Sequence, residues 1–93
     1  MRFECLYYKG KRITSITNIN NILSSNGFYW LLDCEFENAE IELRNDTIIW
    51  KSGTLYSGRW YYGIWENGVF HGIWENGIWV NGDMKGKFLS GIK

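Results

Sequence analysis

The stretch GIWENGVFHGIWENGIWVNG, residues 63–82, repeats one short phrase: a glycine, any residue, a bulky apolar residue, and one or two more residues before the next glycine. The phrase extends in both directions, from Gly53 to Phe88. The bulky residues two positions after each glycine of this series are Leu55, Trp60, Trp65, Phe70, Trp74, Trp79, Met84 and Phe88. Because a catalytic site needs different residues at different places, a phrase repeated this closely specifies an architecture before it specifies a chemistry.

Three Asn-Gly pairs, at 67–68, 76–77 and 81–82, predict tight turns of the primed type, because glycine and asparagine adopt positive φ more easily than other residues. Only two or three residues remain between turns, enough for a very short strand. Such strands build either a meandering antiparallel sheet or a β-solenoid, in which each phrase forms one side of a turn. We predict a mainly β fold with an elongated, repetitive antiparallel sheet, and the β-solenoid is the alternative. In both, the bulky residues stack in a row, and in the sheet that row packs against the glycines of neighbouring phrases.

The residues before the repeat have ordinary patterns. Residues 2–8 alternate apolar and polar side chains, and the turn at 9–11 leads into the β-branched run 12–16, so we expect an N-terminal hairpin. Residues 17–27 place apolar side chains at helical spacing, which predicts one short helix with Thr17 as its cap and Gly27 at its end.

The segment FYWLL, residues 28–32, is a continuous apolar run of strand length and predicts a central strand. After residue 34 apolar residues alternate with acids, and the alternation changes phase at Asn38, which predicts a bulge. The acids that then share the solvent side are Glu35, Glu37, Glu40 and Glu42. We interpret them as a solvated strand face that blunts an edge, because no second type of metal ligand accompanies them.

Length and composition bound the function. The 93 residues form a single domain, 1–93, in which 1–50 cap one end of the repetitive sheet of 51–93. Ten basic and ten acidic residues balance, which removes the long-range field that attracts nucleic acid or an anionic membrane. Two cysteines are too few for a disulfide framework, and we expect reduced thiols facing a core. The charged N-terminus and the absence of a long apolar run lead us to expect a cytoplasmic protein with no membrane contact.

The segment GIWENGVFHG, at 63–72, resembles the first half of a MORN repeat through Gly63, Trp65, Gly68 and Gly72. Weaker copies extend over residues 53–91, with a period that is truncated relative to the MORN unit. The resemblance implies an elongated antiparallel sheet used for protein contacts or dimerisation and, in some members, for lipid headgroups.

Two shorter segments resemble other families. CEFENAEI, at 34–41, is similar to two pentapeptide repeats, with Cys34 and Ala39 as the small residues. That resemblance implies a square β-helix, and some pentapeptide proteins imitate duplex DNA. GRWYYG, at 58–63, is similar to the aromatic phrase of choline-binding and glucan-binding repeats, which implies a cell-wall ligand.

The sequence offers no catalytic constellation. His71 is the only histidine and follows a repeat phrase, where a structural role is expected. No serine has a histidine or lysine partner placed by the sequence, and no glycine series continues as a phosphate-binding loop. We therefore expect no enzyme, no cofactor and no metal.

We predict a non-catalytic protein-interaction module whose aromatic repeat face binds a protein partner or a second copy of the chain. The partner-binding residues expected on that face are Trp60, Tyr61, Tyr62, Trp65, Phe70, Trp74 and Trp79. The small size and the residue bias typical of AT-rich DNA suggest an inhibitor of a host defence protein, encoded by a phage or mobile element. One alternative is a nucleotide or nucleic-acid binder, whose basic residues at the two ends of the chain would converge into one patch. Another is a structural, self-assembling repeat protein.

Overall fold

The computed structural model describes residues 2–93, which form two helices and eleven strands. The N-terminal elements are β1 (Phe3–Tyr8), β2 (Lys11–Ile13), α1 (Ile16–Ser25), α2 (Tyr29–Leu32), β3 (Glu35–Arg44) and β4 (Thr47–Ser57). The short strands that follow are β5 (Arg59–Trp60), β6 (Ile64–Trp65), β7 (Val69–Phe70), β8 (Ile73–Trp74), β9 (Ile78–Trp79), β10 (Asp83–Met84) and β11 (Lys87–Phe88). The prediction of a mainly β fold with many short strands is confirmed.

The short strands stack in parallel and not as an antiparallel sheet. They form three rows, β4–β6–β9, β4–β7–β10 and β5–β8–β11. Trp50 pairs with Trp65 and Trp65 pairs with Trp79, so successive turns take 15 and 14 residues. The arrangement is therefore the alternative that the sequence left open, a β-solenoid, with three sides to each coil. Three phrases, and not one, return the chain to its starting side.

The corners of the coil explain the glycines. Gly77 has a φ of 129°, but Asn76 before it has a negative φ. The side-chain Oδ1 of Asn76 accepts a hydrogen bond from the Gly77 N–H at 2.9 Å. The predicted primed turns are therefore wrong, because a primed turn reverses the chain whereas a corner only redirects it. A Cβ on Gly77 would lie 2.5 Å from the carbonyl oxygen of Gly63 in the preceding coil. Glycine is thus needed for the close stacking of one corner on the next.

The N-terminal hairpin and the first helix form as predicted, with one difference at the cap. Strands β1 and β2 pair antiparallel. The α1 helix begins two residues earlier than expected, because the Oγ of Ser15, and not of Thr17, accepts the Asn18 N–H at 3.3 Å. At the other end Gly27 adopts a φ of 85°, and the Phe28 N–H donates to the Leu23 carbonyl at 2.8 Å.

The FYWLL segment is not a central strand, because residues 29–32 form the one-turn helix α2. The helix packs against β5 and places the Trp30 ring 5.4 Å from that of Trp60, measured between ring centroids. A run of five apolar residues fits either state, and the contact with the first coil selects the helix. Within residues 2–93 no helix is long and apolar enough to cross a membrane.

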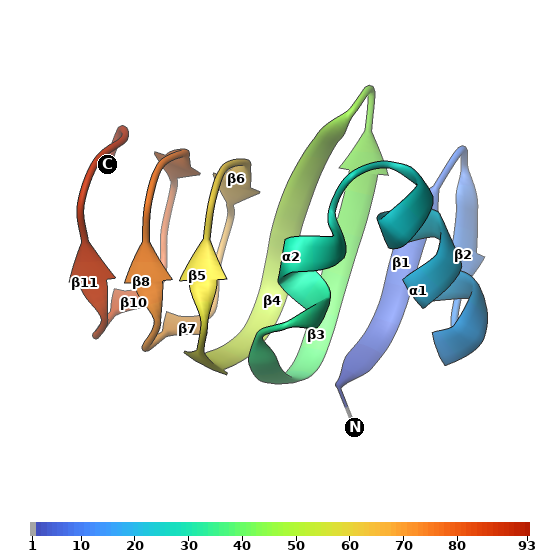
Figure 1. Cartoon of the computed structure of the whole chain (residues 1–93), viewed down its shortest axis with the longest axis horizontal. Helices are drawn as coiled ribbons and strands as arrows, with labels where there is room; N and C mark the ends of the chain where they lie inside the picture. The colour runs from blue at the N-terminus through green and yellow to red at the C-terminus, as the bar shows by residue number, and fades with distance from the viewer. Residues whose placement is uncertain (1) are drawn as a thin grey trace.

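Figure 1 shows how the two parts of the chain share two layers. The back layer is one long sheet in the order β10–β7–β4–β3–β1–β2. The front layer is α1 and α2 over the N-terminal part, followed by β5, β8 and β11 over the repeats. The elements from β1 to β3 therefore lie at one end of the solenoid.

Strand β3 has the predicted bulge. Asn38 adopts a φ of 56°, and the pairing with β4 shifts between Glu37 and Glu40. Residues on the inner side of β3 are buried, whereas its four glutamates are exposed or half-buried on the outer side. The outer face is therefore solvated as expected, but the glutamates do not blunt an edge, because β3 pairs with β1 on one side and with β4 on the other.

Candidate functional site

The seven residues predicted to bind a partner divide into two groups. Trp60, Trp65, Phe70 and Trp74 have 0% of their surface exposed and Trp79 has 7%, whereas Tyr61 and Tyr62 are 45% and 44% exposed. The five buried rings cannot touch a partner, so this part of the prediction is wrong. An open antiparallel sheet would have left one face of the aromatic row free. The three-sided coil instead closes around the row.

The buried rings form the core of the solenoid. Trp65 lies almost parallel between Trp50 and Trp79, with centroids 4.7 and 5.4 Å apart. A second stack places Trp74 between Trp60 and Phe88, at 5.3 and 5.8 Å. The two stacks meet edge to face, a geometry that aromatic quadrupoles favour. The rows of parallel strands thus continue inward as rows of stacked rings.

Tyr61 and Tyr62 lie where the chain leaves β5, and their rings pack on a residue of the N-terminal cap. Each ring centroid is 5.6 Å from that of Trp30, and Tyr62 is also 5.6 Å from Phe28. Tyr29, on the exposed side of α2, has 65% of its surface in solvent. Residues from two segments that are far apart in the sequence therefore meet at the junction of the cap and the first coil.

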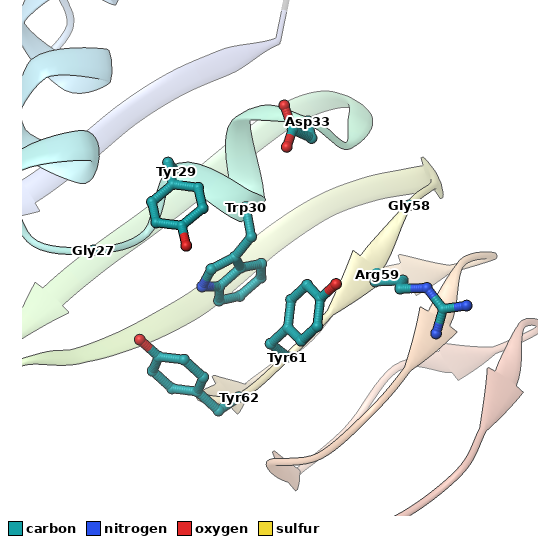
Figure 2. Close-up of a pocket in the computed structure, with 8 residues that line it drawn as sticks. All are labelled: Gly27, Tyr29, Trp30, Asp33, Gly58, Arg59, Tyr61 and Tyr62. Carbon is teal, nitrogen blue, oxygen red and sulfur yellow. The ribbon is translucent and has the colours of Figure 1, made fainter.

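A cavity of about 750 Å³ opens at this junction, and we call it the tyrosine pocket. Its lining residues are Gly27, Tyr29, Trp30, Asp33, Gly58, Arg59, Tyr61 and Tyr62. Figure 2 shows the three tyrosine rings around the indole of Trp30, with Asp33 and Arg59 farther along the pocket. The guanidinium of Arg59 also pairs with Glu75 of the next coil, which fixes its position.

Sequence reasoning found Tyr61 and Tyr62 but missed the contribution of α2. Tyr29 and Trp30 were assigned to a buried strand, and Asp33 and Arg59 were not singled out. The sequence carried no signal for this, because only the helical turn seen in the structure over residues 29–32 turns Tyr29 away from the side that buries Trp30 and Leu31.

The histidine and the two cysteines occupy different environments, one at the surface and the others in the core. His71 stacks on Tyr56 at the surface, with ring centroids 6.2 Å apart. Both cysteines are free and buried, as expected. Burial raises the pKa of the Cys34 thiol to about 11, so it is protonated at neutral pH. Between residues 2 and 93 no cluster of three or more His, Cys, Asp or Glu side chains could hold a metal.

The basic residues at the two ends of the chain do not converge. Lys11 and Arg12 lie on β2 at one end of the long sheet, and Lys87 lies on β11 at the far end of the solenoid (Figure 1). The single basic patch considered for nucleic-acid binding is therefore not formed.

Comparisons with protein-family models, curated proteins and solved structures gave no significant match to this chain. The MORN-like and pentapeptide-like segments thus remain resemblances. The geometry differs from what each resemblance implies. The repeat strands pair in parallel, whereas MORN repeats imply an antiparallel sheet, and each coil has three sides, whereas pentapeptide repeats imply a square coil.

Proposed function

We propose that this chain is a non-catalytic protein-interaction module that binds its partner through the tyrosine pocket. The observation that carries the proposal is the meeting of three exposed tyrosines, Tyr29, Tyr61 and Tyr62, around one cavity while the other predicted contact residues are core. Tyrosine is over-represented at binding hot spots, because its ring contributes a large contact area and its hydroxyl a hydrogen bond.

The pocket is suited to a protein side chain or loop because its rings are already held. Tyr62 rests on both Phe28 and Trp30, and Tyr61 rests on Trp30. Ordering them on binding therefore costs little conformational entropy. Asp33 and Arg59 place one acidic and one basic group beside the rings, which supports recognition of a partner that offers both apolar and polar groups.

The inhibitor hypothesis belongs to this same site. In our proposal the captured partner is a host defence protein, and occupation of the tyrosine pocket holds that protein in an inactive complex. The activity of the captured protein, measured with and without this chain, tests that step separately from binding.

The experiment is a quantitative pull-down from a lysate of the native host, with and without nuclease, read by mass spectrometry. The bait is the wild-type chain, a Tyr61→Ala/Tyr62→Ala variant, or a Tyr56→Ala variant. Tyr56 is the matched control, because it is 50% exposed and lies outside the tyrosine pocket. The enriched protein is then purified, and its affinity for each variant is measured by calorimetry.

We expect one protein to be retained by the wild-type chain and by Tyr56→Ala after nuclease treatment. The double variant should lose roughly 30-fold or more in affinity, as expected for removal of a hot spot. Equal binding by the double variant would refute the assignment of the pocket. Capture that disappears with nuclease would favour the nucleic-acid alternative instead.

A further inference from the structure

The last coil of the solenoid has an open edge at β10 and β11. In the coil before it, the carbonyls of Gly68, Phe70, Gly72 and Trp74 accept hydrogen bonds from the N–H groups of Asp83, Lys85, Lys87 and Leu89. The equivalent carbonyls of the last coil are those of Gly82, Met84, Gly86 and Phe88. Within residues 2–93 no strand pairs with the outer side of β10 or β11.

At the open edge of β10, one residue, Met84, directs both its backbone N–H and its backbone carbonyl away from the preceding coil. In the neighbouring row, Trp65 and Trp79 occupy the equivalent inward-facing position. The Trp65 carbonyl accepts from Val80, and the Trp79 N–H donates to Ile92, so both groups point to the next coil. By the same pattern, the N–H and the carbonyl of Met84 both point out of the open edge.

This pattern fits a second copy of the same edge. When two β10 strands meet antiparallel across a two-fold axis at Met84, each Met84 donates to and accepts from the other. Asp83 of one copy then lies opposite Lys85 of the other, as a non-hydrogen-bonded pair, in which the side chains approach most closely. Asp83 and Lys85 are both exposed, and the axis creates the ion pair twice.

The other end of the solenoid cannot make the same contact. The outer side of β4 is paired with β3, and Trp30 of α2 covers Trp60 of the first coil. Strand β2, at the far edge of the long sheet, is unpaired on its outer side as well, but a contact between two copies of the β10 edge is closed by its own two-fold axis and forms a pair and not a filament. Pairing would also cover Met84 and Phe88, the partly buried residues that end the aromatic core.

We propose that two copies of this chain form a two-fold dimer through antiparallel pairing of β10, with Met84 on the axis and two Asp83–Lys85 ion pairs beside it. The dimer is weak, because the paired strand is only two residues long. This surface is separate from the tyrosine pocket, so the dimer does not depend on the proposed function.

The test is sedimentation velocity over a concentration series from about 10 µM to about 1 mM, which covers the range of weak dimers. Four forms of the full chain are compared: wild type, Lys85→Asp, the charge swap Asp83→Lys/Lys85→Asp, and Lys11→Asp. The last is the control, because it changes the net charge equally on exposed β2, away from the open edge. Circular dichroism verifies that each variant is folded.

We expect the wild type and Lys11→Asp to dimerise alike. Lys85→Asp places acid opposite acid twice and should weaken the dimer roughly 10- to 100-fold. The charge swap keeps opposite charges facing each other and should restore it. A wild-type chain that stays monomeric throughout the series would overturn the proposal, as would a charge swap that fails to restore pairing. The latter result, combined with wild-type binding of an acidic peptide, would assign the open edge to an acidic strand of another protein.

Discussion

Replacing Trp65 by alanine should lower the free energy of unfolding by about 4 kcal/mol. The ring is completely buried, stacks between Trp50 and Trp79, and meets the second stack edge to face. Truncation of a buried aromatic residue costs about 3–5 kcal/mol, and a site enclosed by stiff rings has little freedom to collapse around the cavity. The whole domain is stabilised by only about 5–14 kcal/mol, so this one change removes a large part of it.

The assay is urea denaturation followed by circular dichroism in the far ultraviolet, because tryptophan fluorescence changes with the substitution itself. Trp79→Ala is the comparison, since Trp79 lies in the last coil, is 7% exposed and has a stacked partner on one face only. It should cost less than Trp65→Ala, about 2–3 kcal/mol. Equal costs, or a Trp65→Ala cost below about 1 kcal/mol, would refute the description of the stacked rings as one continuous core.

Three further predictions concern a corner, a cap and a thiol. In thermal melts, Gly77→Ala should lower the free energy of unfolding by more than about 3 kcal/mol and Gly10→Ala by about 1 kcal/mol. Both glycines have positive φ, but only Gly77 has no space for a Cβ. Equal losses of stability would contradict the crowded corner at Gly77. Ser15→Ala should cost about 1 kcal/mol and Thr17→Ala less, since only Ser15 caps α1; the reverse order, in urea titrations, would exclude that cap. Burial raises the pKa of the Cys34 thiol from near 9 in the unfolded chain to about 11 in the folded one. This difference contributes about 2–3 kcal/mol to the free energy of unfolding, present in full below pH 9, and the contribution should disappear as the pH rises from about 9 to 11. Cys34→Ser should flatten that part of the stability profile, and an unchanged slope would show that other groups cause it.

The repeated phrase predicted the local elements well. Its glycines indicated where the chain changes direction, although not the type of turn, and its short intervals indicated very short strands. The packing of rings on glycines is found at Gly77, where an added Cβ would lie 3.1 Å from the Trp74 ring. The number of phrases in each turn could not be predicted, because it depends on how far each corner redirects the chain. That angle is fixed by the stacking of one coil on the next, which is a contact between residues about 14 positions apart.

The candidate site was predictable only in part, for the same reason. A row of large aromatic residues has the same sequence pattern whether one face stays open or a coil encloses it. Tyr61 and Tyr62 remain outside because they occupy the corner between Trp60 and Gly63, at the point where the chain passes the cap. Tyr29 could not be recognised, because the apolar run around it has no periodicity that separates a strand from a single helical turn.

The 14- or 15-residue turn has a consequence for how such a chain can change in length. Inserting one five-residue phrase moves every later side to the wrong row, so strands, corners and rings lose their partners together. Inserting three phrases adds one complete layer, lengthens the solenoid by about 4.8 Å and leaves every row in place. The unit that duplication can copy without damage is therefore the full turn, although the unit visible in the sequence is the phrase.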